Sequence, residues 1–248
     1  MDVNYKYFWH YIAKQDDYKN LKVLDYGCGR GEILSLLLKE GIDACGVDIY
    51  HCGPSEEVLN SELYKTGKIK IIKNGERLPF DDNLFDLIIS NQVFEHVADI
   101  DFVVSELSRI LKKNGKIYHH FPSKEVWREG HIGILFSHWL PKFSKIRYWY
   151  IYFFRLFGFG YNKNGLSKKD WAKKSFDYLN NYCYYRPYKE LKKIFSEYGI
   201  KHQEIEYIKY RGQNNIILKK LVKIKFFKNF YQMLFRKLAF MVIELRKK

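Results

Sequence analysis

The first half of this chain alternates between two hydrophobic spacings, one typical of buried strands and one typical of amphipathic helices. Short apolar runs predict five strands, at residues 21–25, 43–48, 69–72, 85–90 and 115–121. Apolar residues three or four positions apart predict helices at about 31–40 and 99–112. A further helix is expected within the first twenty residues. Strands that alternate with helices form βαβ units, so the sequence predicts an α/β fold with a doubly wound, mostly parallel sheet.

This rhythm breaks at residues 122–185, which are rich in bulky aromatic side chains. An insertion after the fifth strand lies beyond the carboxyl ends of the strands, where open α/β sheets bind their ligands. Regular spacing returns with a helix near 187–198, a strand near 201–208 and a last, antiparallel strand at 212–220. The sequence therefore predicts one domain over residues 1–218, with 122–185 as its substrate-side insertion.

Residues 219–248 combine an apolar stripe at helical spacing with ten Lys or Arg side chains and a single acid, Glu244. They predict a basic amphipathic helix. Such a helix can bind an anionic membrane surface through both its charge and its apolar face. It can equally pack on the domain or on a second copy, and the sequence leaves the oligomeric state open. Nucleic acid is less favoured as a partner because no recognised binding motif is present.

The composition limits the class of protein. The chain has 248 residues, of which 47% are hydrophobic, enough for a large core, and a formal net charge of +15. It contains no stretch of about 18 uncharged apolar residues and no signal-peptide pattern. We therefore expect a cytoplasmic protein, with a peripheral position on the inner face of the plasma membrane if residues 219–248 bind lipid.

The first strand runs directly into a glycine-rich turn. The sequence Val23-Leu24-Asp25-Tyr26-Gly27-Cys28-Gly29-Arg30-Gly31 is followed at once by a helical pattern. Glycine lets ligand atoms lie against the backbone, next to the exposed N–H groups of a helix N-terminus. Asp48 ends the second strand, where a carboxylate can accept hydrogen bonds from both ribose hydroxyls. Together these features predict a Rossmann-like nucleoside site.

The details of the turn favour one nucleoside over another. A dinucleotide pyrophosphate prefers G-x-G-x-x-G with no anion nearby. Here Asp25 stands two residues before the first glycine, and its charge would repel a pyrophosphate. The same carboxylate can attract the ammonium and sulfonium groups of S-adenosylmethionine. An NAD-dependent sugar-modifying enzyme is accordingly the less favoured alternative.

These segments resemble class I S-adenosylmethionine-dependent methyltransferases of the type 11 group. The glycine turn is similar to their first motif, and Gly46-Val47-Asp48 to their ribose-binding strand end. Further resemblance lies in Glu76-Arg77-Leu78-Pro79-Phe80, in Phe85–Val97 and in the turn before the fifth strand. The resemblance covers about residues 20–122. It implies a methyltransferase with S-adenosylmethionine as cofactor.

The resemblance assigns cofactor contacts to particular positions. Asp25 is expected at the methionine end, Asp48 at the ribose, and Glu76, Arg77 and Leu78 at the adenine. Asn91, at the end of the fourth strand, can meet the methionine carboxylate or amine. The complete set of expected cofactor-binding residues is Asp25, Gly27, Gly29, Asp48, Ile49, Glu76, Arg77, Leu78 and Asn91.

Three histidines are candidates for the base that takes the proton of the acceptor, because the histidine pKa lies near working pH. His96 follows the fourth strand on the ligand side and is the first choice. His131 and His138 lie in the insertion, where each could instead make a partly buried polar contact. No Asp, Glu or His cluster has convincing metal-ligand spacing, so the sequence predicts no metal site.

A looser resemblance concerns the acceptor. Glu129-Gly130-His131-Ile132-Gly133, His138-Trp139-Leu140-Pro141 and Tyr185-Arg186-Pro187 are similar to segments of methyltransferases from bacterial surface-polysaccharide pathways. This implies O-methylation of a sugar, or of a group attached to one, in capsule or lipopolysaccharide assembly. The glycan could be nucleotide-linked or lipid-linked. A lipid or quinone-like acceptor is the alternative.

Overall fold

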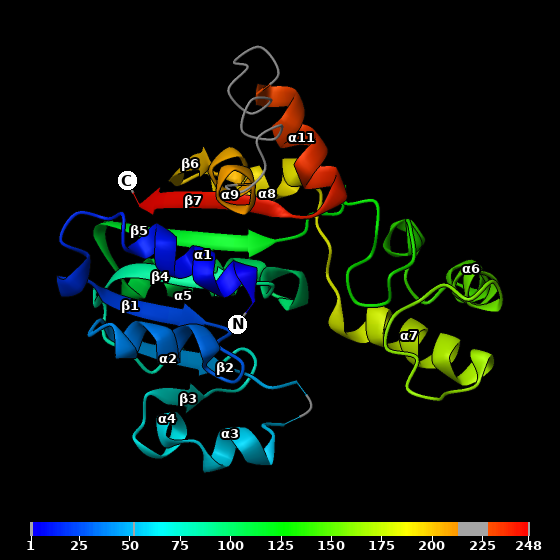
Figure 1. Ribbon diagram of the computed structural model, residues 1–248, viewed down its shortest axis with the longest axis horizontal. Coiled ribbons are helices and arrows are strands. Elements are labelled where there is room, and N and C mark those ends of the chain that lie inside the picture. The colour runs from blue at the N-terminus through cyan, green and yellow to red at the C-terminus, as the bar shows by residue number, and fades with distance from the viewer. Residues whose placement is uncertain (1, 52, 213–227, 248) are drawn as a thin grey trace.

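The computed structural model describes residues 2–51, 53–212 and 228–247, and a seven-stranded sheet forms its centre (Figure 1). The strands lie in the order β3-β2-β1-β4-β5-β7-β6, and β7 runs antiparallel to both of its neighbours. The mostly parallel α/β sheet predicted from the sequence is confirmed. The strands are β1 (Lys22–Tyr26), β2 (Asp43–Asp48), β3 (Ile69–Ile71), β4 (Phe85–Asn91), β5 (Leu111–Phe121), β6 (Tyr198–His202) and β7 (Met241–Lys247).

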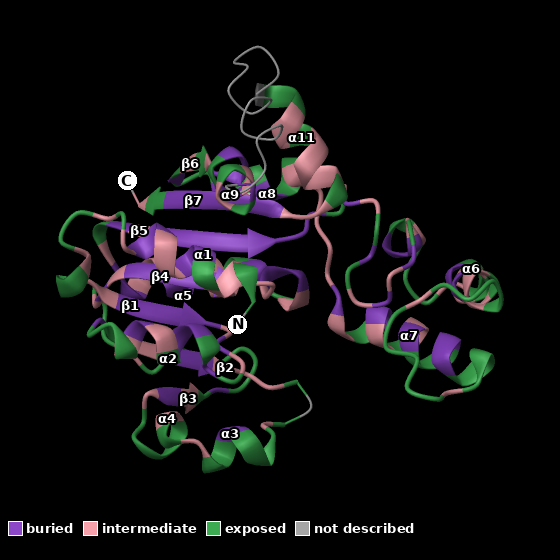
Figure 2. Ribbon diagram, in the orientation of Figure 1, coloured by how far each residue is buried: buried purple, intermediate pink, exposed green. Residues whose placement is uncertain are grey.

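Helices cover both faces of this sheet, and the strands β1, β5 and β7 are largely buried between them (Figure 2). Phe8, Leu34 and Tyr207, from α1, α2 and α9, belong to the core on one face. Leu107 of α5 and Leu191 of α8 belong to the core on the other face. The helices around the sheet are α1 (Val3–Ile12), η1 (Tyr18–Asn20), α2 (Glu32–Lys39), α3 (Glu56–Asn60), α4 (Glu62–Lys65), η2 (Phe94–His96), α5 (Ile100–Ile110), α8 (Tyr188–Ile194), α9 (Glu204–Arg211) and α11 (Lys228–Leu238).

The insertion forms a lobe with a small core of its own. It contains η3 (Ser137–Trp139), α6 (Lys145–Leu156) and α7 (Lys168–Tyr182). Ile151 of α6 packs with Trp171 and Leu179 of α7 in this core. Figure 1 shows the lobe beside the sheet, on the side toward which β1, β4 and β5 point. The fold thus places the insertion at the carboxyl ends of the strands.

The prediction of one helix over residues 219–248 is wrong at its C-terminal end. Residues 241–247 form β7, which lies between β5 and β6. Met241, Ile243 and Leu245 pack into one core and Val242 into the other, so an alternating pattern is buried on both faces. The spacing of the apolar residues in 241–247 fits both a helical stripe and a central strand. The segment forms a strand because it pairs with the edges of β5 and β6, which would otherwise be unpaired. Residues 213–227, and with them most of the strand expected at 212–220, lie outside the described residues.

The strand expected at 201–208 is also corrected. β6 ends at His202, because the backbone N–H of Gln203 turns to donate to the carbonyl of Val242. Residues 204–211 then form α9, whose Tyr207 ring meets the ring of Tyr7 at 4.9 Å between centroids. The alternation of Ile205 and Tyr207 suits a strand, but this contact with α1 is made from a helix.

None of the helices in the described part of the chain is long and apolar enough to cross a membrane.

Candidate functional site

The glycine turn after β1 has backbone angles that few other residues adopt. Gly27, Gly29 and Gly31 have φ of +78°, +51° and +76°. A Cβ at Gly27 would lie 2.2 Å from the side chain of Val93, whereas a Cβ at Gly29 would meet no described atom within 4 Å. The turn therefore packs tightly against the loop after β4 at Gly27 and leaves open space at Gly29.

Asp48 ties this turn to the end of β2. Its Oδ2 atom accepts a hydrogen bond from the N–H of Gly29 at 2.8 Å, and its Oδ1 atom accepts one from the N–H of Tyr50 at 2.8 Å. The Tyr50 hydroxyl donates to the carbonyl of Gly29 at 2.5 Å. A carboxylate oxygen can accept more than one hydrogen bond, so Asp48 keeps capacity for hydroxyl donors from a ligand.

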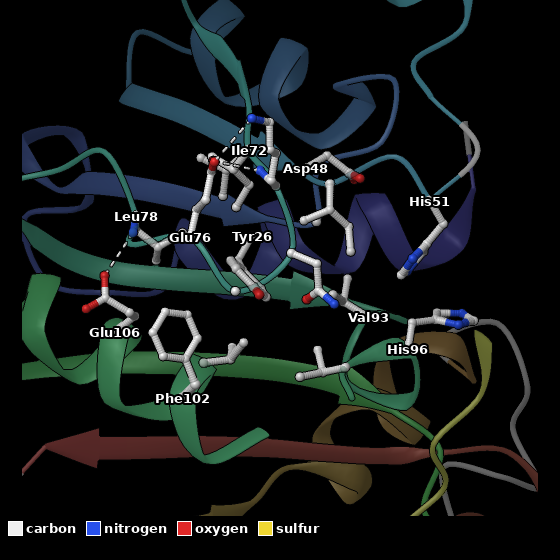
Figure 3. A pocket seen from close by; sticks show the side chains of 18 of the residues that line it. Tyr26, Asp48, His51, Ile72, Glu76, Leu78, Val93, His96, Phe102 and Glu106 are labelled. Atoms are coloured by element: carbon white, nitrogen blue, oxygen red, sulfur yellow. Dashed lines mark hydrogen bonds and ion pairs between the residues drawn. The ribbon is translucent and has the colours of Figure 1, made fainter. Parts of the chain in front are cut away.

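A pocket opens beside the turn, and Asp48 and Ile49 line it together with Tyr26 and Gly27 (Figure 3). Its walls are largely apolar, and the apolar contributors are Val47, Ile72, Leu78, Val93, Val97, Phe102 and Val103. Figure 3 shows Leu78 and Glu106 at one end and His51 and His96 at the other. The pocket is thus an elongated apolar slot with polar groups at defined points.

Two carboxylates hold the loop at the Leu78 end of the pocket. Glu106 accepts a hydrogen bond from the N–H of Leu78 at 2.8 Å and forms an ion pair with Arg109 at 2.7 Å. The hydrogen bond from Arg109 lowers the pKa of Glu106 despite its partial burial. Glu76 accepts from the N–H of Lys73 at 3.0 Å. The loop over residues 73–78 is therefore fixed from both of its ends.

Two buried polar atoms near the turn lack partners among the described residues. They are Oδ2 of Asp25 and Oδ1 of Asn91. Burial, and then the charge of Asp48, raises the pKa of Asp25 to about 7. A buried carboxylate without a donor is costly unless a ligand supplies a cation or N–H group. Asp25 and Asn91 therefore indicate that a polar, positively charged part of a ligand belongs beside them.

A chain of polar side chains leads from the insertion to the His51–His96 end of the pocket. Glu129 is fully buried, and its Oε1 atom lies 2.7 Å from Nδ1 of His131. The Nε2 atom of His131 lies 3.1 Å from Nε2 of His96. Nδ1 of His96 lies 2.6 Å from the carbonyl oxygen of Tyr182. Glu129 also accepts hydrogen bonds from the Tyr185 hydroxyl and from the backbone N–H groups of His131 and Ile132.

These contacts determine the tautomers of both rings. A carboxylate and a carbonyl oxygen only accept, so the Nδ1 atom of each histidine carries a proton and donates it. Both Nε2 atoms then face each other with lone pairs unless one additional proton lies between them. Burial opposes protonation of His131, but the hydrogen bond and charge of Glu129 outweigh it and raise its pKa. Burial lowers the pKa of His96 to about 4. When an additional proton is present, it therefore resides on His131, which donates it to His96.

The same cluster includes a second buried acid. Both carboxylate oxygens of Glu95 are buried and have no partner within the described ranges. Burial raises the pKa of Glu95 to about 8. Ligand-type atoms of Glu95, His96 and His131 lie within 4.8 Å of one another, a spacing at which a divalent ion could bind. The prediction that the chain has no metal site stays a prediction.

Comparison with known proteins agrees with this geometry. Residues 24–119, which carry the glycine turn, Asp48 and the loop after β4, match a family model described as a methyltransferase domain. Residues 24–119 therefore carry a methyltransferase domain. This supports the enzyme class and the cofactor predicted from the sequence, a methyltransferase that uses S-adenosylmethionine.

A curated relative of the methyltransferase domain is the ubiquinone biosynthesis O-methyltransferase of Pelagibacter ubique, which is 35% identical over 104 residues. The match covers 40% of this chain and 41% of the relative. This chain thus matches less than half the length of that relative.

Two solved structures share the overall fold. The YcgJ protein from Bacillus subtilis is 16% identical, with a TM-score of 0.50 and 97% of each chain covered. An S-adenosylmethionine-dependent methyltransferase from Mesorhizobium loti is 15% identical, with a TM-score of 0.50 and coverage of 92% of this chain and 91% of that one. At these identities the likeness concerns the fold.

The pocket of the methyltransferase domain fits its cofactor. Asp48 stands where ribose hydroxyls would be held, and the apolar walls near Leu78 and Phe102 suit a flat purine ring. The unpartnered oxygen of Asp25 suits the positively charged methionine end. The space at Gly29 permits close approach of a ligand to the backbone.

The structure brings together most, but not all, of the residues expected from the sequence. Gly27, Asp48, Ile49, Glu76, Leu78 and His96 line the pocket. Asp25, Gly29 and Asn91 lie at the turn and at the strand ends beside it. The expectation that Arg77 contacts the adenine is corrected. Its side chain points to Asp82 on the surface, at 3.3 Å.

His138 is a second correction. Its ring packs on Tyr185 at 4.6 Å between centroids, and its Nε2 atom lies 3.2 Å from the carbonyl of Lys124. Burial lowers its pKa to about 4. His138 thus braces the lobe, apart from the contact between His96 and His131.

Glu129, Glu95 and Tyr185 were not predicted from the sequence as members of the histidine cluster. The available signal was the spacing Glu129-x-His131, which lets a carboxylate reach its histidine within one tight turn. Glu106 and Phe102 were not predicted as pocket residues either. They lie on α5, which packs on the sheet, and their spacing there is that of an ordinary amphipathic helix.

Proposed function

We propose that this chain transfers a methyl group from S-adenosylmethionine to a hydroxyl oxygen, and that His131 takes up the hydroxyl proton. The ordered chain from Glu129 through His131 to His96, which ends at the cofactor pocket, carries this proposal. When bound, the cofactor supplies a methyl group on a positively charged sulfur. Displacement at that methyl group needs alignment of the acceptor oxygen and a destination for its proton.

The residues around the pocket provide the alignment. Asp48 fixes the position of the turn and of the nucleoside, and Asp25 compensates positive charge at the other end. Apolar contacts from Val93 and Phe102 keep water out of the slot. The acceptor oxygen would enter at the end of the pocket where His51 and His96 lie (Figure 3).

Glu129 and His131 provide the destination of the proton. A hydroxyl at this end of the pocket can donate to Nε2 of His96, which passes the proton across the 3.1 Å contact to Nε2 of neutral His131. The proton comes to rest on His131, because the buried charge of Glu129 stabilises its imidazolium form. Glu129 itself remains charged, since the hydrogen bonds from His131, Tyr185 and two backbone N–H groups outweigh its burial and lower its pKa. His96 faces the pocket and orients the hydroxyl.

A sugar hydroxyl is the acceptor that these features favour. Beside His131 lies a depression lined by aromatic rings and amides, including Tyr161, Asn162, Trp171 and Tyr178. Sugars pack their apolar CH faces on such rings, and their hydroxyls pair with amides. A sugar hydroxyl also holds its proton more tightly than a phenol does, so it has more need of a base. This supports a glycan acceptor of the surface-polysaccharide type.

A phenolic acceptor is the second candidate. The Pelagibacter relative is named for ubiquinone biosynthesis, which favours a quinone-like substrate. The match covers only about two fifths of each protein, so this support is weaker than that of the depression beside His131.

The test is a methyl-transfer assay with labelled S-adenosylmethionine and two acceptor panels, sugars and hydroxylated aromatic compounds. We expect labelled O-methyl product from the sugar panel, and calorimetric binding of S-adenosylhomocysteine but not of NAD. Binding of NAD alone would contradict the proposed reaction. Labelling of the aromatic panel alone would assign the second acceptor class. Addition of EDTA should leave the rate unchanged, and loss of the rate with recovery on adding a divalent ion would replace the proton role of the histidine pair with a metal role.

A further inference from the structure

A large apolar surface remains uncovered on the lobe. Four apolar side chains of α6, and that of the residue directly after the helix, are between 43% and 68% exposed. They are Ile146, Trp149, Phe153, Leu156 and Phe157. The first four recur every three or four positions, and Phe157 follows Phe153 by four, so they lie along one side of the helix. Phe143, before α6, and Phe159, after it, are also exposed, with 67% and 55% of their surfaces accessible. We call these seven residues the α6 ridge.

The α6 ridge is held on a rigid support. The opposite side of α6 carries Ile151, which is fully buried in the small core against α7. Arg147, also buried, donates to the side-chain oxygen of Asn180 on α7 at 2.8 Å. It donates as well to backbone carbonyls of residues in and after η3. The ridge therefore cannot turn inward without breaking these contacts.

The charge around the ridge is mostly positive. Residues 131–176 contain nine Lys or Arg side chains and a single acid, Asp170. Lys145 is exposed at the start of α6. Lys163 donates to the carbonyl of Gly158 at 2.7 Å and Lys168 to that of Leu156 at 3.3 Å, so two cations lie at its other end. The apolar row is thus flanked at both ends by ammonium groups.

We propose that the α6 ridge binds the surface of an anionic lipid membrane. Large aromatic and aliphatic side chains on one helix face, bordered by lysines, match the requirements of the interfacial zone of a bilayer. A second copy of this surface is a poorer occupant, because it would bring two strongly positive lobes together. This assignment does not depend on the proposed reaction. It places the membrane contact on the insertion instead of on residues 219–248.

The test is co-sedimentation of the full chain with phosphatidylcholine vesicles and with mixed phosphatidylglycerol–phosphatidylcholine vesicles. We expect binding to the mixed vesicles, with a blue shift of tryptophan emission that disappears in Trp149→Phe. A variant with Trp149→Ser and Phe153→Ser should bind at least about tenfold more weakly. Both positions are more than half exposed, so its melting temperature and its affinity for S-adenosylhomocysteine should stay unchanged.

The matched control lies on α11, where Phe230 and Met233 are 50% and 40% exposed. Phe230→Ser with Met233→Ser should leave vesicle binding intact. Failure of the unaltered chain to bind mixed vesicles would overturn the proposal, and so would equal binding by the α6 variant. Loss of binding in the α11 variant alone would return the contact to the C-terminal region. Sedimentation as a dimer that the α6 substitutions dissociate would assign the ridge to a second copy.

Discussion

At the scale of single residues, two carboxylates organise the site, the half-buried Asp48 and the fully buried Glu129. Asp48 and Glu129 each accept hydrogen bonds from backbone N–H groups while they face a ligand-binding region. Each one therefore shapes a loop and also acts on what binds there. Substitution of either should affect both properties, and the choice of variant can separate them.

Asp48→Ala should abolish measurable binding of S-adenosylhomocysteine. It removes the acceptor for two ribose hydroxyls and for the N–H of Gly29, which together correspond to about 3 kcal/mol or more than a hundredfold in affinity. Asp48→Asn keeps one acceptor oxygen and should therefore lose less affinity for S-adenosylhomocysteine than Asp48→Ala. Calorimetric titration measures both variants. Unchanged affinity in Asp48→Ala would show that the nucleoside lies elsewhere.

Glu129→Gln should change the pH dependence of the reaction. In the unaltered protein the pKa of His131 is raised, and only its neutral form accepts a proton, so kcat/KM should rise with pH through that pKa. Without the charge of Glu129, burial becomes the dominant influence on His131 and lowers its pKa. The rising limb should then move to lower pH, with a plateau about a hundredfold lower.

The control for this experiment is His10→Ala, a half-exposed histidine of α1 that should leave the profile unchanged. His131→Ala should lower turnover to a similar degree as Glu129→Gln and retain affinity for S-adenosylhomocysteine. A Glu129→Gln profile that coincides with that of the unaltered protein would remove Glu129 from the proton path.

At the scale of elements, the turn after β1 can be tested with a matched pair of glycines. Gly27 and Gly41 have φ of +78° and +79°, so alanine is strained to a similar extent at both, by about 1 kcal/mol. Only at Gly27 does the added Cβ collide, 2.2 Å from Val93. Gly27→Ala should therefore lose a further 2 kcal/mol or so of stability and most cofactor affinity. Gly41→Ala should keep its affinity, as measured by thermal unfolding with and without S-adenosylhomocysteine.

The second element-scale prediction concerns β7. Deletion of residues 241–247 removes the strand that lies between β5 and β6, along with Val242 and Ile243 from both cores. We expect loss of the cooperative thermal transition and of near-ultraviolet circular dichroism. A deletion variant that unfolds cooperatively near the melting temperature of the full chain would contradict this assignment.

Sequence periodicity predicted the elements whose partners are close along the chain. The strands β1, β2 and β4 and the helices α2 and α5 alternate within short βαβ units, so local spacing alone defines them. β7 and α9 were mispredicted because their conformations depend on contacts with α1 and β5, more than a hundred residues away. Asp48 and the glycine turn were found by their motif. The meeting of His96 with His131 joins two loops 35 positions apart, and no local pattern records it.

At the scale of the whole molecule, buried neutral histidines affect stability in acid. Burial lowers the pKa of His119 and of His120 to about 3. Between about pH 3 and pH 6.5 the unfolded chain binds protons at these positions and the folded chain does not. The free energy of unfolding should therefore fall as the pH falls through this window, by about 1.4 kcal/mol per pH unit for each histidine.

His120→Phe tests this prediction. The His120 ring lies among aromatic rings, with centroids of Phe8 at 4.3 Å and Phe240 at 5.5 Å, and its nitrogens have no partner in the described part of the chain. Phenylalanine should fit there. The free energy of unfolding, measured by urea unfolding at several acidic pH values, should then decrease less steeply as the pH falls, by the contribution of one histidine. An unchanged slope would show that His120 takes up a proton in the folded state.

The position of β7 also has a consequence for biosynthesis. β6 pairs with β7, and β7 pairs with β5. The part of the sheet formed by β1 to β5 can therefore fold first, whereas β6 can join the sheet only after β7 has been translated. During that interval the hydrogen-bonding edge of β5 is exposed in the nascent chain. The last step of sheet formation must join segments about 125 residues apart, a long-range closure that is slow in comparison with local folding. Chaperone dependence and the effects of translation rate on yield should therefore concentrate on this step, and substitutions in β7 should reduce the amount of protein made before they alter its chemistry.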